Sequence, residues 1–213
     1  MHTYWENSWK TVDSDRITKY VCSLTDQPDD LISRLDQCGV QSVCDAGCGC
    51  GIHTLKLAAA GFIVSGFDLS ARAVEIARQL LDHVGVSADL KPADICATGY
   101  ADHQFDGVLS RDVLDHMPKQ SAIAAVRELC RITKPGGIIL FTLDSLDEEY
   151  LTEPHEINAD GDYVYTGGKW NGMVFHPYTA DAARELVPNG TICTITDDSG
   201  ALTIELHMLA DHR

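Results

Sequence analysis

The sequence has 213 residues, of which 45% are hydrophobic and 23% are charged, a composition typical of one soluble globular domain with a sizeable core. Its formal net charge of −16 argues against a nucleic-acid substrate, whose phosphates would be repelled, and favours a small molecule. Residues 1–10 are polar and aromatic, and no apolar run approaches the ~18 residues of a membrane span. We therefore expect a cytoplasmic protein that acts away from membranes.

Eight cysteines occur in the sequence, and in the absence of a signal peptide they predict reduced thiols rather than disulfide bonds. Three of them, Cys44, Cys48 and Cys50, lie close together. The first falls on a predicted strand and the other two in a glycine-rich turn, and no paired C-x-x-C or H-x-H motif supplies the remaining ligands of a zinc site. The sequence therefore predicts no metal ion.

Residues 1–40 predict an N-terminal helical arm ahead of the first strand. Tyr4, Trp5 and Trp9 form a short aromatic cluster, and helices are predicted over residues 13–24 and 28–38. Two interpretations of the cluster stay open. The aromatic side chains either pack the arm onto the domain or close over a bound ligand.

Residues 42–68 predict a strand, a glycine turn, a helix and a second strand. The turn reads Asp45-Ala46-Gly47-Cys48-Gly49-Cys50-Gly51, and a second apolar run, residues 62–67, ends at Asp68. Such a unit places backbone N–H groups and a helix N-terminus around a polar or anionic ligand group. A carboxylate at the tip of the second strand can accept hydrogen bonds from a ribose diol. The dinucleotide pattern G-x-G-x-x-G/A is not met, because position 52 is isoleucine.

The rest of the chain alternates helices and apolar strands. Helices are predicted over residues 71–83, 118–131 and 180–186, and strands over 86–91, 105–109, 138–143, 191–196 and 202–209. This order predicts a mostly parallel sheet with helices on both faces and a terminal antiparallel pair. Residues 144–177 break the alternation and predict a hairpin, from Tyr163 to Phe175, with an acidic edge on the substrate side.

Five motifs in this order resemble those of the class I S-adenosylmethionine-dependent methyltransferases, from about Val40 to the C-terminus. They are the glycine turn, Gly66-Phe67-Asp68-Leu69-Ser70, Asp94-Ile95, Phe105-Asp106-Gly107-Val108-Leu109-Ser110 and Lys134-Pro135-Gly136-Gly137. Thr133 replaces the leucine that usually precedes the last motif. The resemblance implies a single α/β domain, Rossmann-like and doubly wound, with a mostly parallel sheet and a reversed last strand. It also implies S-adenosyl-L-methionine as cofactor and a small-molecule methyl acceptor.

The resemblance also implies roles for individual residues. Cofactor binding is assigned to Asp45, Gly47, Cys48, Gly49, Gly51, Asp68, Leu69, Asp94, Ile95 and Ser110. Asp45 is expected to orient the loop, Asp68 to bind the ribose hydroxyls and Asp94 to accept from the adenine amino group. Ile95 is expected against the adenine ring, and Ser110 near the methionine amine.

No catalytic base is identified, since in-line methyl transfer needs one only if the acceptor loses a proton early. His116, His155 and His176 are candidates, and a packing or capping role competes for the first. Tyr163, Trp170 and His176 are the candidate substrate residues, as parts of a lid. Three alternatives stay open: a tellurite- or thiopurine-resistance-like methyltransferase, a non-catalytic cofactor-binding module, and a nicotinamide-dependent oxidoreductase.

Overall fold

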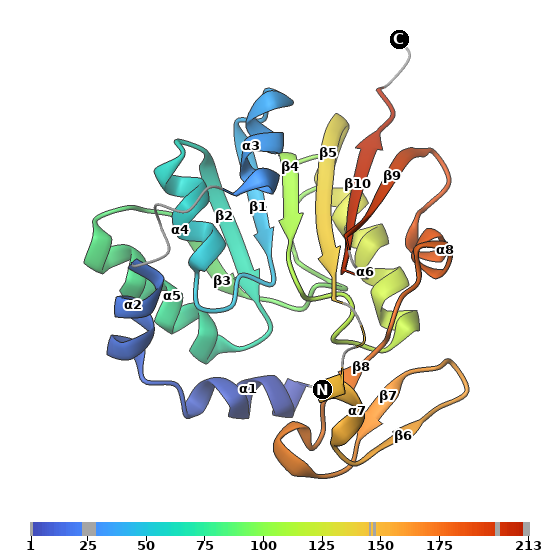
Figure 1. Ribbon diagram of the computed structural model, residues 1–213. Coiled ribbons are helices and arrows are strands. Elements are labelled where there is room, and N and C mark those ends of the chain that lie inside the picture. The colour runs from blue at the N-terminus through green and yellow to red at the C-terminus, as the bar shows by residue number, and fades with distance from the viewer. Residues whose placement is uncertain (1, 23–28, 145, 147, 199–200, 211–213) are drawn as a thin grey trace.

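A seven-stranded sheet in the order β3-β2-β1-β4-β5-β10-β9 forms the centre of the computed structural model (Figure 1). The structure describes residues 2–22, 29–144, 146, 148–198 and 201–210. The strands are β1 (Ser42–Ala46), β2 (Ile63–Asp68), β3 (Asp89–Pro92), β4 (Phe105–Ser110), β5 (Thr133–Leu143), β9 (Thr191–Asp198) and β10 (Ala201–Met208). The first five pair in parallel, and β10 runs antiparallel to both β5 and β9. The predicted fold class is confirmed.

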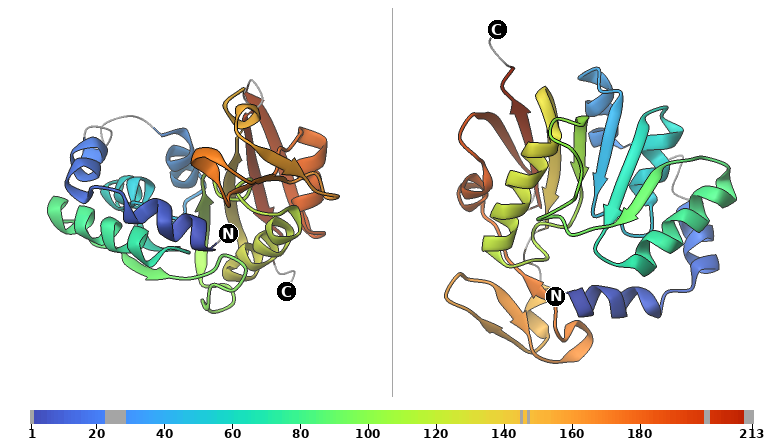
Figure 2. Two further views of the ribbon diagram at one scale, coloured as in Figure 1. Left: turned by 90° about the horizontal axis from the view of Figure 1, so that it is seen from below. Right: turned by 180° about the vertical axis from the view of Figure 1, so that it is seen from behind.

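Helices cover the two faces of this sheet unequally (Figure 2). On one face lie α3 (Asp30–Gln37), α4 (Ile52–Ala59) and α5 (Ala71–Val84), and on the other lies α6 (Lys119–Ile132) with α8 (Ala180–Ala183). Between β3 and β4 the second face is covered by the loop 93–104 instead of a helix. Tyr100 of this loop packs its ring against Phe67 and Phe105, and all three side chains are buried.

The N-terminal arm crosses the carboxyl ends of the parallel strands (Figure 1). Its aromatic cluster lies on a helix, α1 (His2–Lys10), and α2 (Ser14–Cys22) follows. The predicted end of the second helix, residues 23–24, lies outside the described residues. The arm is held on the domain by apolar contacts. Buried side chains of α4 and α5 pack against Trp9, Val12 and Ile17.

Residues 148–175 form a small unit beside the arm, consisting of α7 (Glu148–Thr152), β6 (His155–Ile157), β7 (Tyr163–Tyr165), η1 (Gly168–Trp170) and β8 (Val174–Phe175). We refer to these residues as the insert. The predicted hairpin is present, and β6 adds a third strand to it. Tyr165, Met173 and Phe175 are buried in the insert, and Tyr4 and Trp5 of α1 pack against them. The arm and the insert are therefore in contact.

Several predicted boundaries are wrong, among them the start of the strand predicted over residues 86–91, which begins at Asp89; three have local reasons. The helix expected from residue 28 begins at Asp30, because the Asp29 side chain caps it by accepting hydrogen bonds from the amides of Leu31 and Ile32. The expected turn at residues 134–137 belongs to β5, where the register with β4 shifts and Gly136 has a φ of +77°. The helix expected over residues 180–186 ends as a 3-10 turn, η2 (Arg184–Leu186).

Within the described parts of the chain, no helix has the length and apolar character needed to cross a membrane.

Glu128 on α6 anchors the loop 93–104 to the rest of the domain. Its Oε1 accepts hydrogen bonds from the Thr98 amide at 2.8 Å and the Thr98 hydroxyl at 2.7 Å. Arg131 donates to the Glu128 carboxylate and, at 2.8 Å, to the carbonyl of Tyr100. The Arg131 guanidinium and the Thr98 bonds lower the pKa of Glu128 to about 2.

We predict that Glu128→Gln lowers the free energy of unfolding at pH 7 by about 1–2 kcal/mol, because charge-assisted hydrogen bonds are lost. The folded-state pKa is depressed, so this stabilisation is complete above pH ~4.5 and disappears as the pH falls towards about 2. Urea denaturation between pH 2 and pH 7 measures the difference, with the exposed Glu75→Gln as the matched control. A wild-type advantage that stays constant down to pH 2 would contradict the assignment.

Candidate functional site

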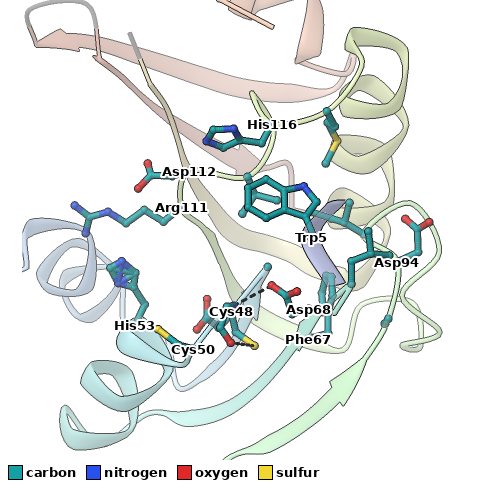
Figure 3. A pocket seen from close by; sticks show the side chains of 18 of the residues that line it. Trp5, Cys48, Cys50, His53, Phe67, Asp68, Asp94, Arg111, Asp112 and His116 are labelled. Carbon is teal, nitrogen blue, oxygen red and sulfur yellow. Dashed lines mark hydrogen bonds between the residues drawn. The ribbon is translucent and has the colours of Figure 1, made fainter. Parts of the chain in front are cut away.

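A cavity of about 330 Å³ lies at the carboxyl ends of β1, β2 and β4, beneath α1 (Figure 3). Its walls come from the glycine turn, the ends of β2 and β3, the segment after β4 and the arm. Such an edge, where parallel strands end, is the ordinary ligand site of an open α/β sheet.

The glycine turn forms the floor of the cavity and is fastened to β2. The amides of Gly47 and Cys48 both donate to the carbonyl of Phe67, at 2.9 Å each. Gly47 has a φ of +80°, and a Cβ there would lie 2.5 Å from Cγ2 of Val113. Glycine therefore allows the turn to take this shape without backbone strain and without crowding Val113. Gly51 is not a lining residue, and its φ of +88° serves the start of α4.

Two carboxylates, of the buried Asp45 and the half-buried Asp68, shape the turn. Asp45 accepts from the Thr54 hydroxyl at 2.5 Å, which ties the end of β1 to the first turn of α4. Asp68, at the end of β2, accepts from the amides of Gly49 at 3.0 Å and Ser70 at 2.8 Å, one on each oxygen. Burial raises the pKa of both carboxyl groups. Asp68 also lines the cavity, so its remaining lone pairs can accept from a ligand.

Charged side chains lie at both ends of the cavity (Figure 3). Asp94 lies at one end, and its Oδ1 accepts from the Cys96 amide at 2.8 Å. Arg111 and His53 line the opposite end. The cavity therefore offers a hydrogen-bond acceptor at one end, and a guanidinium, an imidazole and the carboxylate of Asp112 at the other.

The end of the cavity at which Arg111 and His53 lie was not predicted from the sequence. Arg111 Nη1 donates to Asp29 Oδ2 at 2.9 Å, and His53 Nδ1 is buried without a hydrogen-bond partner within the described ranges. Ser110, expected near this end, is fully buried and is not a lining residue; Arg111 and Asp112, which follow it, line the cavity instead. Two signals in the sequence could have indicated this end. One is His53 in the first helical turn after the glycine turn, and the other is Arg111 directly after β4.

The arm forms the roof of the cavity. Trp5 and Trp9 both line it, and Ser70 Oγ at the start of α5 donates to Glu6 Oε2 of α1 at 2.6 Å. The Trp5 ring lies edge-on to that of His116, with ring centroids 5.5 Å apart. Of the two interpretations of the aromatic cluster, the structure therefore supports both at once: the arm packs on the domain and covers the cavity.

The expected substrate residues of the insert lie outside the cavity walls. Trp170 packs between Tyr150 and Tyr165, and Tyr163 lies against His155, with ring centroids 4.8 Å apart. His176 is buried, and its Nδ1 lies 2.9 Å from Asp162 Oδ1. Of the three candidate histidines, His116 lines the cavity, in contact with the insert through Phe175 and Tyr150.

Comparison with known proteins identifies the family. Residues 44–141 match the family model of a methyltransferase domain. Residues 44–141 therefore belong to a class I S-adenosylmethionine-dependent methyltransferase domain. This methyltransferase domain includes the glycine turn, Asp68 and Asp94, so the resemblance stated from the sequence is confirmed, and S-adenosylmethionine is the cofactor of the family.

Two curated relatives are ubiquinone biosynthesis O-methyltransferases. That of Thiobacillus denitrificans is 36% identical over 115 residues, which are 52% of this chain and 48% of the relative. That of Paraburkholderia xenovorans is 35% identical over 154 residues, or 70% of this chain and 60% of the relative. The methyltransferase chain thus spans about half of the length of the first of these relatives.

A solved structure confirms the fold. Magnesium protoporphyrin IX methyltransferase from Synechocystis PCC 6803, determined with bound S-adenosylmethionine, matches 90% of this chain and 79% of its own with a TM-score of 0.60 and 20% identity.

We predict that Gly47→Ala destabilises the fold by about 1–3 kcal/mol, because alanine adopts the positive φ at a cost and its Cβ crowds Val113. The double variant Gly47→Ala/Val113→Ala should recover the steric part of this loss relative to Val113→Ala alone. Urea denaturation of the four proteins measures the coupling. Strict additivity of the two changes would show that the crowding is absent.

Proposed function

We propose that this chain binds S-adenosylmethionine in the cavity beneath α1 and transfers its methyl group to a hydroxyl of a small, flat acceptor. The observation that supports the proposal is one cavity at the carboxyl ends of the parallel strands, with the glycine turn as its floor and the carboxylate of Asp68 at the end of β2 in its wall. The residues present fit the cofactor, because Gly47 lacks the Cβ that would crowd Val113 and His53 Nδ1 is a buried polar atom still to be satisfied.

The chain offers partners for three polar parts of that cofactor. The N-terminus of α4, with Arg111 and His53, would bind the methionine carboxylate. Asp68 would accept from the two ribose hydroxyls, and Asp94 from the adenine amino group. Ile95, next to Asp94 in the chain, also lines the cavity and would lie against the adenine ring.

When bound, the cofactor supplies a methyl group on a positively charged sulfur. The wall on the acceptor side is formed by Trp5, Val113, His116 and Met117. These side chains are mostly apolar and hold a flat acceptor by shape, which keeps water out and aligns its nucleophilic oxygen. Proximity and alignment of this kind are worth on the order of 7–11 kcal/mol. The names of the two O-methyltransferase relatives support oxygen as the acceptor atom.

We predict that S-adenosylmethionine and S-adenosylhomocysteine bind the purified chain and that NAD does not. Asp68→Asn should weaken binding roughly 10-fold or more, which corresponds to about 1–3 kcal/mol for hydrogen bonds to a charged group. Isothermal titration calorimetry gives the affinities, and Asp82→Asn, an exposed residue of α5, is the matched control. Equal affinities for the two variants would remove Asp68 from the ribose site. Binding without turnover of any phenolic, thiol or inorganic acceptor would favour the non-catalytic alternative.

We further predict that Trp5→Ala raises the KM for the acceptor, because the indole lines the cavity, whereas Trp170→Ala leaves KM within about twofold, because its indole packs inside the insert. Steady-state kinetics of the two folded variants with one phenolic acceptor make the comparison. A larger KM effect from Trp170→Ala would return the insert to the acceptor site.

A further inference from the structure

We propose that Asp29 is a positioning residue for the cofactor: it holds the guanidinium of Arg111 at the end of the cavity where the methionine carboxylate would bind. Arg111 directly follows β4 and lines the cavity, whereas Asp29 precedes α3 and is not a lining residue. Arg111 Nη1 donates to Asp29 Oδ2 at 2.9 Å, across 82 positions of the chain. The inference rests on the proposed function, because it takes the cofactor carboxylate as the ligand of Arg111.

The Asp29 carboxylate is a firm anchor because both of its oxygens have partners. Its side chain is only 5% exposed. Oδ1 accepts from the amides of Leu31 at 3.1 Å and Ile32 at 3.4 Å, which caps α3. Oδ2 accepts from Arg111 and lies 3.8 Å from Nζ of Lys56 on α4. The carboxylate is therefore fixed by the start of α3 and by cations from two other segments.

The Arg111 side chain needs such an anchor. It is 36% exposed and has several rotatable bonds, so holding it in one conformation costs entropy. In Figure 3 it extends away from Trp5 and Asp94, on the same side of the cavity as His53. The bond to Asp29 uses one N–H of the guanidinium. A planar guanidinium held at one corner can still offer parallel N–H bonds to a second carboxylate.

The charges at this end of the cavity suit the amino-acid end of the cofactor. Arg111 and Lys56 together outweigh the single negative charge of Asp29, which leaves positive charge for an anion. Asp112 also lines this end, and its Oδ1 accepts from the Thr142 hydroxyl at 2.6 Å. Methionine carries both a carboxylate and an ammonium group. A guanidinium beside a carboxylate is therefore the complement that this group requires.

A competing interpretation makes Asp29 a rival of the ligand. Both carboxylates would then draw on the same guanidinium, and removal of Asp29 would strengthen ligand binding. The contacts of Asp29 argue against this interpretation, because the two amides of α3 and the Lys56 ammonium share its negative charge with Arg111. The two interpretations predict opposite changes in affinity.

Two ligands that differ at the amino-acid end provide the test. S-adenosylhomocysteine carries the carboxylate, whereas 5′-methylthioadenosine has the same nucleoside and sulfur without the amino-acid group. Isothermal titration calorimetry with the full chain measures both affinities. We expect Asp29→Asn to weaken S-adenosylhomocysteine roughly 5-fold or more and to leave 5′-methylthioadenosine within about twofold, because asparagine still caps α3 but lacks the charge. Asp30→Asn, an exposed residue in the first turn of α3, is the matched control.

A double-mutant cycle shows whether Asp29 acts through Arg111. Arg111→Met should weaken S-adenosylhomocysteine roughly 10-fold or more, because charge-assisted hydrogen bonds to the carboxylate are lost. Adding Asp29→Asn to that variant should cause no further loss, since the group that Asp29 positions is then absent. Circular dichroism and thermal unfolding of each variant establish that it folds.

Three outcomes would overturn the inference. Equal losses for both ligands in Asp29→Asn would mean that Asp29 only supports the fold. A gain in affinity for S-adenosylhomocysteine would mean that Asp29 competes with the ligand. Full additivity in the cycle would mean that Asp29 does not act through Arg111. A wild-type chain that binds neither ligand would overturn the proposed function together with this inference, whereas binding of both with an unchanged ratio in Asp29→Asn would overturn the inference alone.

Discussion

The carbonyl oxygen of Phe67 is the point on which the site depends. It accepts the amides of Gly47 and Cys48 at 2.9 Å each, and the next residue, Asp68, accepts that of Gly49 at 3.0 Å. These bonds fasten the turn after β1 to the end of its parallel neighbour β2. Because the turn is fixed there, α4 begins beside the cavity, and its first residues, Ile52 and His53, line it. The positive φ of Gly47 thus determines the shape of the cavity floor.

The features that depend on local spacing can be predicted from the sequence. The glycine turn, Asp68 and Asp94 each stand at the end of a strand, and the alternation of apolar runs with helical patterns places those ends on one edge of the sheet. The helix of the arm was harder to predict. Its tryptophans are spaced as on a helix, but the segment lacks the continuous apolar face that usually indicates a packed helix. Its helix becomes stable only through contact with α5 and the insert.

Features that depend on long-range placement could not be predicted. Ser110 shares the buried face of β4 with Val108, because alternate residues of a strand point the same way, so the cavity meets Arg111 and Asp112 instead. Trp170 packs inside the insert. The Asp144 amide donates a hydrogen bond to the Asp115 carboxylate, 29 positions earlier in the chain. The parallel pairing of β4 and β5 brings these two residues together.

The hydrogen bond between Ser70 and Glu6 links the arm to the same helix whose first turn follows Asp68. Trp5 and Trp9 of that anchored helix line the cavity, so displacement of α1 would widen the way in and out for a molecule the size of a nucleoside. The residence time of a bound molecule would then depend on how often α1 moves aside. Its equilibrium affinity would depend on the contacts it makes while α1 covers the cavity. Substitutions in α1 that touch no ligand can therefore change turnover while leaving the strength of binding nearly as it was.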